Sequence, residues 1–191
     1  MIYLPIASVV VNNFNYGRFI ADAIDSALAQ TYPNTEVIVV DDGSTDESRD
    51  IIAGYGSGVT AVLKINGGQA SAFNAGFAAS HGEVVIFLDA DDTLSHTAVE
   101  RAVELFAQPN VVKVHWPLWR VDRHGRKTGA LEPDRPLIEG DLRDLAIRYG
   151  PEMYESPPNS PPTSHTRPDH AISPGWTRQR RSPSPSGSSR E

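Results

Sequence analysis

Short apolar runs alternate with helical segments through the first 150 residues, and this alternation constrains the fold more than any other feature. The apolar runs cover residues 6–11, 37–40, 59–65 and 84–88. Apolar residues recur at helical spacing in residues 17–30, 45–55, 70–79 and 98–106. Short apolar runs separated by helices are typical of buried parallel strands. We therefore expect an α/β fold with a mostly parallel sheet, right-handed crossovers and helices on both faces.

Two further elements are expected after the fourth helix. Residues 111–121 and the turn at 122–125 predict a hairpin that carries Trp116 and Trp119. Residues 141–149 predict one short helix.

The composition changes near residue 150. Residues 151–191 contain nine Pro, nine Ser and five Arg, and few apolar side chains. Such a segment cannot bury enough apolar surface to offset its chain entropy. We expect a domain over residues 1–150 and a disordered, low-complexity, Pro/Ser-rich C-terminal tail over residues 151–191. The tail is either a basic interaction arm or an end produced by an altered reading frame or a truncated gene; the contacts of an arm would be Arg178, Arg180 and Arg181.

Charge and cysteine content exclude several classes of protein. The formal net charge of −7 argues against a nucleic-acid partner, because such proteins carry a basic excess. The chain lacks the roughly 18 consecutive apolar residues of an integral membrane segment, and its first five residues do not predict a secretory signal. With no cysteine, thiolate metal sites and cysteine nucleophiles are excluded. These features favour a cytoplasmic protein.

Polar loops follow three of the expected strands, at residues 12–15, 41–46 and 89–92. Ligands of parallel α/β sheets bind beyond the carboxyl ends of the strands, so these loops are the candidate site. The loop at 41–46 could also be a turn with a helix cap. Residues 66–68 (NGG) could cradle phosphate groups on backbone N–H groups or form a tight turn.

The run Asp89-Ala90-Asp91-Asp92 predicts a divalent cation site. Three carboxylates in four residues repel one another, and Mg²⁺ or Mn²⁺ would compensate that repulsion. The alternative is that Asp92 and Thr93 begin a helix. The six histidines have no ligand spacing, and we expect them at the surface or partly packed.

Four segments together resemble glycosyltransferase family 2. They are residues 8–15 (SVVVNNFN), 39–46 (VVDDGSTD), 66–76 (NGGQASAFNAG) and 87–92 (FLDADD). They occur in the family's order, and the resemblance covers about residues 5–125. It implies the GT-A (Rossmann-like) fold and the N-terminal, nucleotide-sugar-binding half of an inverting enzyme.

The resemblance also implies residue roles. The metal ligand would be Asp91, which would hold the cation that bridges the donor diphosphate, while Asp89 would contact the ribose or the metal shell. The other donor-binding residues implied are Asn12, Asn13, Phe14, Asn15, Asp41, Asp42, Gly67, Gly68 and Asn74. One departure is Phe73, where many relatives have an arginine.

The implied activity is a metal-dependent, inverting transfer of sugar from a nucleotide-sugar donor to a glycan, polysaccharide or lipid-linked acceptor. No catalytic base can be assigned; the available carboxylates are Glu132, Asp134, Glu139, Asp141 and Asp144. The alternative is a truncated or non-catalytic nucleotide-sugar-binding module that lacks the acceptor half, and we expect weak donor binding and poor transfer from this chain. A response-regulator-like domain would also place acids at strand ends, but the run at 89–92 is not its pattern.

Overall fold

The computed structural model describes residues 3–109, 111–122 and 126–132. These residues divide into two compact units, and the boundary along the chain falls between His115 and Trp116. The first unit contains all the loops that the sequence singles out. The expected helix at 141–149 and the expected tail at 151–191 lie outside the described residues.

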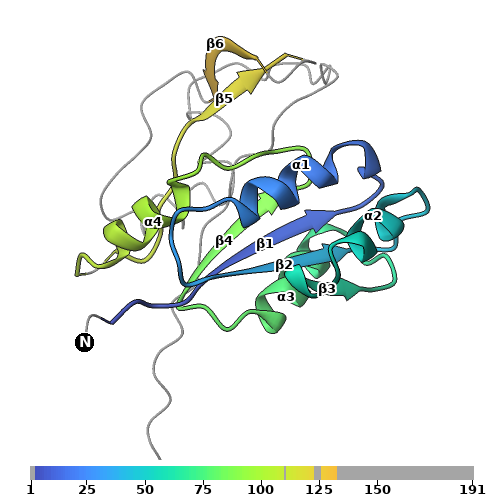
Figure 1. The fold of residues 1–191 in the computed structure, drawn as a ribbon, viewed down its shortest axis with the longest axis horizontal. Coiled ribbons are helices and arrows are strands. Elements are labelled where there is room, and N and C mark those ends of the chain that lie inside the picture. The colour runs from blue at the N-terminus through green and yellow to red at the C-terminus, as the bar shows by residue number, and fades with distance from the viewer. Residues whose placement is uncertain (1–2, 110, 123–125, 133–191) are drawn as a thin grey trace, which may run out of the picture. The chain divides into compact units, whose positions relative to one another are not determined.

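The first unit is an α/β domain built on one parallel sheet (Figure 1). Its strands are β1 (Ala7–Asn13), β2 (Thr35–Asp41), β3 (Thr60–Leu63) and β4 (Val84–Asp89). Its helices are α1 (Gly17–Leu28), α2 (Ser48–Gly54), the short 3-10 helix Gly56–Gly58, α3 (Gln69–Ala79) and α4 (Ala98–Phe106). The four strands lie in the order β3-β2-β1-β4, which confirms the expected α/β fold.

Helix α3 packs on one face of this sheet, and Figure 1 shows α1 on the other. The core under α3 is built from alternate residues of three neighbouring strands, Val10, Ile38, Val40 and Val85, with Ala72 of the helix. Gly76 allows the close approach of α3, because a Cβ at this position would lie 2.2 Å from Val10 Cγ1. Burial of alternate apolar residues on both faces explains why the strands read as continuous apolar runs.

The register of the sheet brings the polar loops to one edge. Asn12 at the end of β1 is paired with Asp89 of β4, and Asn13 is paired with Asp41 of β2. All the strands run parallel, so their carboxyl ends and the loops that follow them meet there. Ligand sites of open α/β sheets form at this edge.

Helix α2 begins later than the sequence suggests. Residues 45–47 precede the helix, and the Asp46 carboxylate accepts hydrogen bonds from Ser48 N at 3.1 Å and Gly17 N at 2.8 Å. Asp46 therefore joins the starts of α2 and α1, and it does not lie inside a helix.

The second unit contains an antiparallel pair, β5 (Leu118–Val121) and β6 (Lys127–Glu132). The expected hairpin exists, but its first strand is shorter, because residues 111–117 are not in a strand. Pro117 immediately precedes β5 and cannot donate to a strand ladder. Residues 123–125 of the expected turn lie outside the described residues; on either side of them, Asp122 Oδ1 accepts from Arg126 N at 3.0 Å.

Candidate functional site

Buried polar side chains join the loops after β1 and β2. Asn13 is 1% exposed, and its Nδ2 donates to Asp41 Oδ2 at 2.9 Å and to Ser44 Oγ at 3.1 Å. Asn15 N donates to Ser44 Oγ at 2.9 Å, and Asn15 Oδ1 accepts from Thr45 N at 2.8 Å. Asn15 has a φ of 58°, a left-handed conformation that asparagine tolerates better than most residues. The two loops therefore form one cross-linked structure.

Asp41 is fully buried beneath this structure. Its carboxylate accepts from Asn13, from Ser44 N at 3.0 Å and from Arg49 Nε at 2.7 Å. Burial by itself raises the pKa of Asp41, but the hydrogen bonds from Ser44, Arg49 and Asn13 outweigh it and hold the pKa below its ordinary value. Arg49 also donates to Lys64 O at 2.9 Å, so this ion pair connects β2, α2 and the end of β3.

Asp42 joins the β2 loop to the start of α3. It is 2% exposed, and its carboxylate accepts from Gly67 N at 3.0 Å, from Gly68 N at 2.8 Å and from the Lys64 ammonium group. Burial raises the pKa of Asp42, but the hydrogen bonds from Lys64, Gly67 and Gly68 outweigh it and keep the pKa low. Gly68 has a φ of +83° and caps α3. The two glycine N–H groups therefore bind an anion, and that anion is the chain's own Asp42.

Other residues expected at the site present accessible surface. Asn12 is half-buried at the end of β1, and the Phe14 side chain is 45% exposed in the loop that follows. Asn74 is also exposed, but it lies on α3 five residues after the first residue of the helix. Phe73 packs against Phe87 of β4 with ring centroids 5.0 Å apart, so it belongs to the packing between α3 and the sheet.

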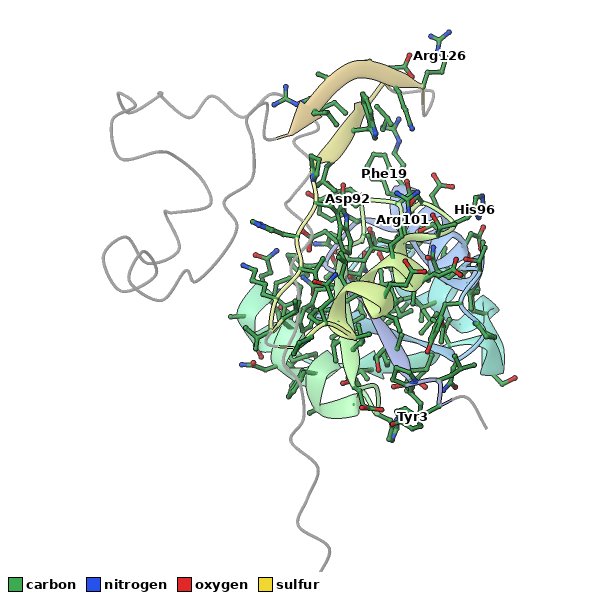
Figure 2. All side chains as sticks on the ribbon, turned by 90° about the vertical axis from the view of Figure 1, so that its left-hand side faces the viewer. Tyr3, Phe19, Asp92, His96, Arg101 and Arg126 are labelled. Carbon is green, nitrogen blue, oxygen red and sulfur yellow. The ribbon has the colours of Figure 1, made fainter. Side chains whose placement is uncertain are left out.

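The acidic run begins at Asp89, the last residue of β4, and continues into the loop that follows. Ala90 N donates to Asn12 O at 3.0 Å, which ties the run to the end of β1. Gln69 Nε2, at the start of α3, is 3.4 Å from Asp89 Oδ1. Asp92 is 6% exposed, and burial together with the charges of Asp91 and Asp89 raises its pKa to about 8. The three carboxylates therefore share one small region at this edge. Figure 2 shows where Asp92 lies, at the end of the first unit that is far from Tyr3.

The donor set of this run fits a divalent cation. Asp92 Oδ1 is buried and has no hydrogen-bond partner among the described residues, and the neighbouring carboxylates add negative charge. A hard cation would satisfy that oxygen and reduce the repulsion. Within the described residues no group of three or more His, Asp or Glu side chains is arranged to hold a metal ion by itself. A cation here would therefore need ligands besides these carboxylates, such as the phosphate oxygens of a bound nucleotide and water.

Residues that sequence reasoning did not include also shape the site. Arg49 and Lys64 neutralise the two buried aspartates, and Gln69 contacts Asp89. The one available signal was Lys64, which interrupts the apolar pattern of its strand. A hollow of about 470 Å³ lies beside these residues, lined by Gly43, Ser44, Arg49, Leu63, Lys64, Ile65 and Asn66.

The fold and this edge define a GT-A type α/β domain, and comparison with known proteins identifies the family. Residues 8–158 match the family described as Glycosyl transferase family 2. The chain therefore belongs to glycosyl transferase family 2, which confirms the resemblance seen in the four sequence segments.

Similar proteins are named as glycosyltransferases. An uncharacterized glycosyltransferase of Nostoc sp. is 40% identical over 157 residues, which cover 80% of this chain and 48% of that protein. The uncharacterized glycosyltransferase EpsJ of Bacillus subtilis is 36% identical over 146 residues, covering 74% of this chain and 42% of EpsJ. The chain thus spans about half the length of these relatives or less.

A solved structure has the same fold. The mannosyltransferase PcManGT from Pyrobaculum calidifontis, in complex with GDP-Man and Mn²⁺, superposes with a TM-score of 0.55 at 29% identity. The match covers 62% of this chain and 36% of PcManGT. Among the described residues, no helix combines the length and apolar character needed to cross a bilayer.

Proposed function

We propose that the carboxyl edge of the sheet binds a nucleotide-sugar donor together with Mg²⁺ or Mn²⁺. We further propose that the protein transfers the sugar, with inversion, to a glycan, polysaccharide or lipid-linked acceptor. One observation carries the proposal: the four segments that resemble the family meet at one edge of the sheet. There Asp89, Asp91 and Asp92 lie beside the cross-linked β1 and β2 loops. The Mn²⁺ and GDP-Man in the complex of the related mannosyltransferase support a donor and a cation of this kind.

The proposed residue roles are those that the resemblance to the family implies. Asp91 is the proposed metal ligand, with Asp89 at the ribose or in the metal shell. Asn12 and Phe14 offer accessible surface at the end of β1 for the nucleotide.

The buried members act through the shape of the loop. Asp41 and Asn13 hold the β2 loop, and Asp42 holds Gly67 and Gly68. Both oxygens of each carboxylate already accept hydrogen bonds within the chain, so Asp41 and Asp42 would serve donor binding by holding these loops in place. Asn15 supports the same loop through its hydrogen bond with Thr45. Contact between Asn74 and the donor would require the donor to extend along α3.

The chemistry explains the acidic run. Cleavage of the bond between the anomeric carbon and the diphosphate places negative charge on the leaving group. A bound divalent cation supplies Lewis-acid stabilisation of that charge. The chain's own carboxylates would hold the cation, and its loops would orient the donor so that an acceptor hydroxyl can approach the opposite face of the sugar.

The acceptor hydroxyl also needs a general base within hydrogen-bond reach. Among the candidate carboxylates, Glu132 lies at the end of β6 in the second unit, and Asp134, Glu139, Asp141 and Asp144 lie outside the described residues. The proposal therefore names no catalytic base.

The test is release of nucleoside diphosphate from a panel of guanosine and uridine diphosphate sugars, with and without Mn²⁺ and a panel of acceptors. The proposal expects metal-dependent release that rises when the correct acceptor is added. Metal-dependent donor binding without release onto any acceptor would support the donor-binding module and contradict transfer by this chain. Equal release by wild type and Asp91→Asn would contradict the proposed metal site.

A further inference from the structure

A second cavity, of about 520 Å³, lies at the opposite edge of the sheet. Its walls are the chain before β1, the segment between α1 and β2, the start of β4 and one side of α4 from its first turn to its end. Figure 2 shows Tyr3, one of its lining residues, at the far end of the unit from Asp92. This volume falls in the range of about 300–1,000 Å³ that is typical of ligand sites. The cavity is therefore separate from the proposed donor site.

The charged groups of the cavity all have one sign. Three glutamates line it, Glu83, Glu100 and Glu104, and none of the described lining residues is Lys, Arg or His. Glu100 and Glu104 lie four residues apart on α4, so their like charges destabilise the helix. Glu104 also lies in the last turn of α4, where the helix dipole disfavours a negative charge. A cationic partner would relieve both costs.

The remaining wall is aromatic and contains proline. Tyr32 and Phe106 are 7% and 4% exposed and form a fixed base, and Tyr32 Oη donates to Pro5 O at 2.7 Å. Tyr3 is 75% exposed at the rim, where its hydroxyl group donates to the Glu83 carboxylate. Pro33 completes this surface. Aromatic grooves of this kind bind extended proline-containing segments, because such segments are already ordered before they bind.

We propose that this cavity binds an extended, proline-containing peptide segment of a partner protein that carries a basic residue. The prolines pack against the exposed side chains of Tyr3, Leu4 and Pro33, with Tyr32 and Phe106 at the base. The basic side chain lies against Glu100 and Glu104. Charge complementarity argues for this occupant, because an uncharged partner that covered the cavity would take the exposed Glu100 and Glu104 side chains out of water without supplying a counter-charge. The proposal does not depend on the donor site.

The experiment measures fluorescence anisotropy of a short labelled peptide, with one arginine flanked by prolines, titrated with the full chain. Two further peptides serve as references, one with glutamate in place of the arginine and one with serines in place of the prolines. The test variant is Glu100→Gln with Glu104→Gln. Its matched control is Asp22→Asn with Asp50→Asn, which removes the same charge from exposed positions on α1 and α2.

The proposal expects saturable binding of the arginine–proline peptide that weakens roughly fivefold or more in the glutamate variant and stays unchanged in the control variant. Both reference peptides should bind more weakly than the first. Tyr3→Ala should also weaken peptide binding. Because the Tyr3 side chain is exposed, this substitution should not unfold the protein.

Three results would overturn the proposal. One is equal peptide binding by the variant that lacks Glu100 and Glu104 and by the control variant, which would mean that any effect of charge comes from the net charge of the protein. Another is equal binding of the serine-substituted peptide, because the aromatic wall would then have no role. The third is peptide binding that appears only in a variant with Arg178→Ser, Arg180→Ser and Arg181→Ser. That result would show that the chain's own basic segment occupies the cavity.

Discussion

Replacement of Asp42 by asparagine tests how the β2 loop and the start of α3 are held together. The variant keeps the size of the side chain and removes its charge. In the wild type this carboxylate accepts from Gly67 N, Gly68 N and the Lys64 ammonium group while it is 2% exposed. The variant loses one charge-assisted acceptor and leaves Lys64 without its anionic partner.

The size of the effect follows from the three contacts. A hydrogen bond to a charged group contributes about 1.5–3 kcal/mol, against about 0.5–1.5 kcal/mol for a neutral one. Water can reach Gly67 and Gly68, which are exposed, and the Lys64 side chain is 21% exposed, so part of the loss is recovered. We expect Asp42→Asn to reduce the free energy of unfolding by about 2 kcal/mol at pH 7.

The pH dependence has a definite sign. The folded-state pKa of Asp42 lies below its ordinary value, so its contribution is fully present above about pH 4. The contribution is lost as the pH falls through the folded-state pKa, and the difference between wild type and variant should shrink there.

Urea unfolding of wild type and Asp42→Asn, measured in steps from pH 7 toward about pH 3, provides the test. The control is Asp50→Asn, an exposed position on α2 that should stay within about 0.5 kcal/mol of wild type. A loss below about 0.5 kcal/mol for Asp42→Asn at pH 7, or a loss that does not change with pH, would refute the reasoning.

The other predictions concern packing, the nucleotide and the tail. Gly76→Ala should destabilise the protein by about 1–2 kcal/mol, because the cost of overpacking against Val10 exceeds the gain in helix propensity. A thermal melt measures the effect, and an unchanged melting temperature would contradict the close approach of α3. Asp41→Ala should weaken nucleotide binding both with and without Mn²⁺, and a defect confined to the Mn²⁺ titration would instead make Asp41 a metal ligand. Limited proteolysis should cut the tail well before any site within residues 6–106, and resistance throughout the tail would show that it is docked; the expected sites are Arg167, Arg178, Arg180 and Arg181.

The sequence allowed the order of strands and helices and the edge that carries the site to be predicted, because both depend on local patterns. Alternation of apolar runs and helical spacing sets the type of each element, and parallel strands then place the loops at residues 12–15, 41–46 and 89–92 together. The strand boundary before β5 was less predictable, since apolar character continues through residues 111–117 although the strand does not.

Contacts between distant residues could not be predicted in the same way. The pairing of Asp42 with Lys64 joins residues 22 positions apart and depends on the pairing of β2 with β3. Burial of Asp92 depends on the packing around the end of β4, which local spacing does not specify. For this reason the sequence left open whether Gly67 and Gly68 bind phosphate, while the structure shows them donating to Asp42.

Calorimetric titration of the wild type and of Asp91→Asn with a nucleoside diphosphate, in the presence and absence of Mn²⁺, tests the central claim most directly. An amide oxygen is a neutral and weaker ligand for a hard cation than a carboxylate. We predict that Mn²⁺ tightens nucleotide binding to the wild type and has little effect on binding to Asp91→Asn, with both proteins equally folded. The same Mn²⁺-dependent gain in both proteins would contradict a cation site at Asp91.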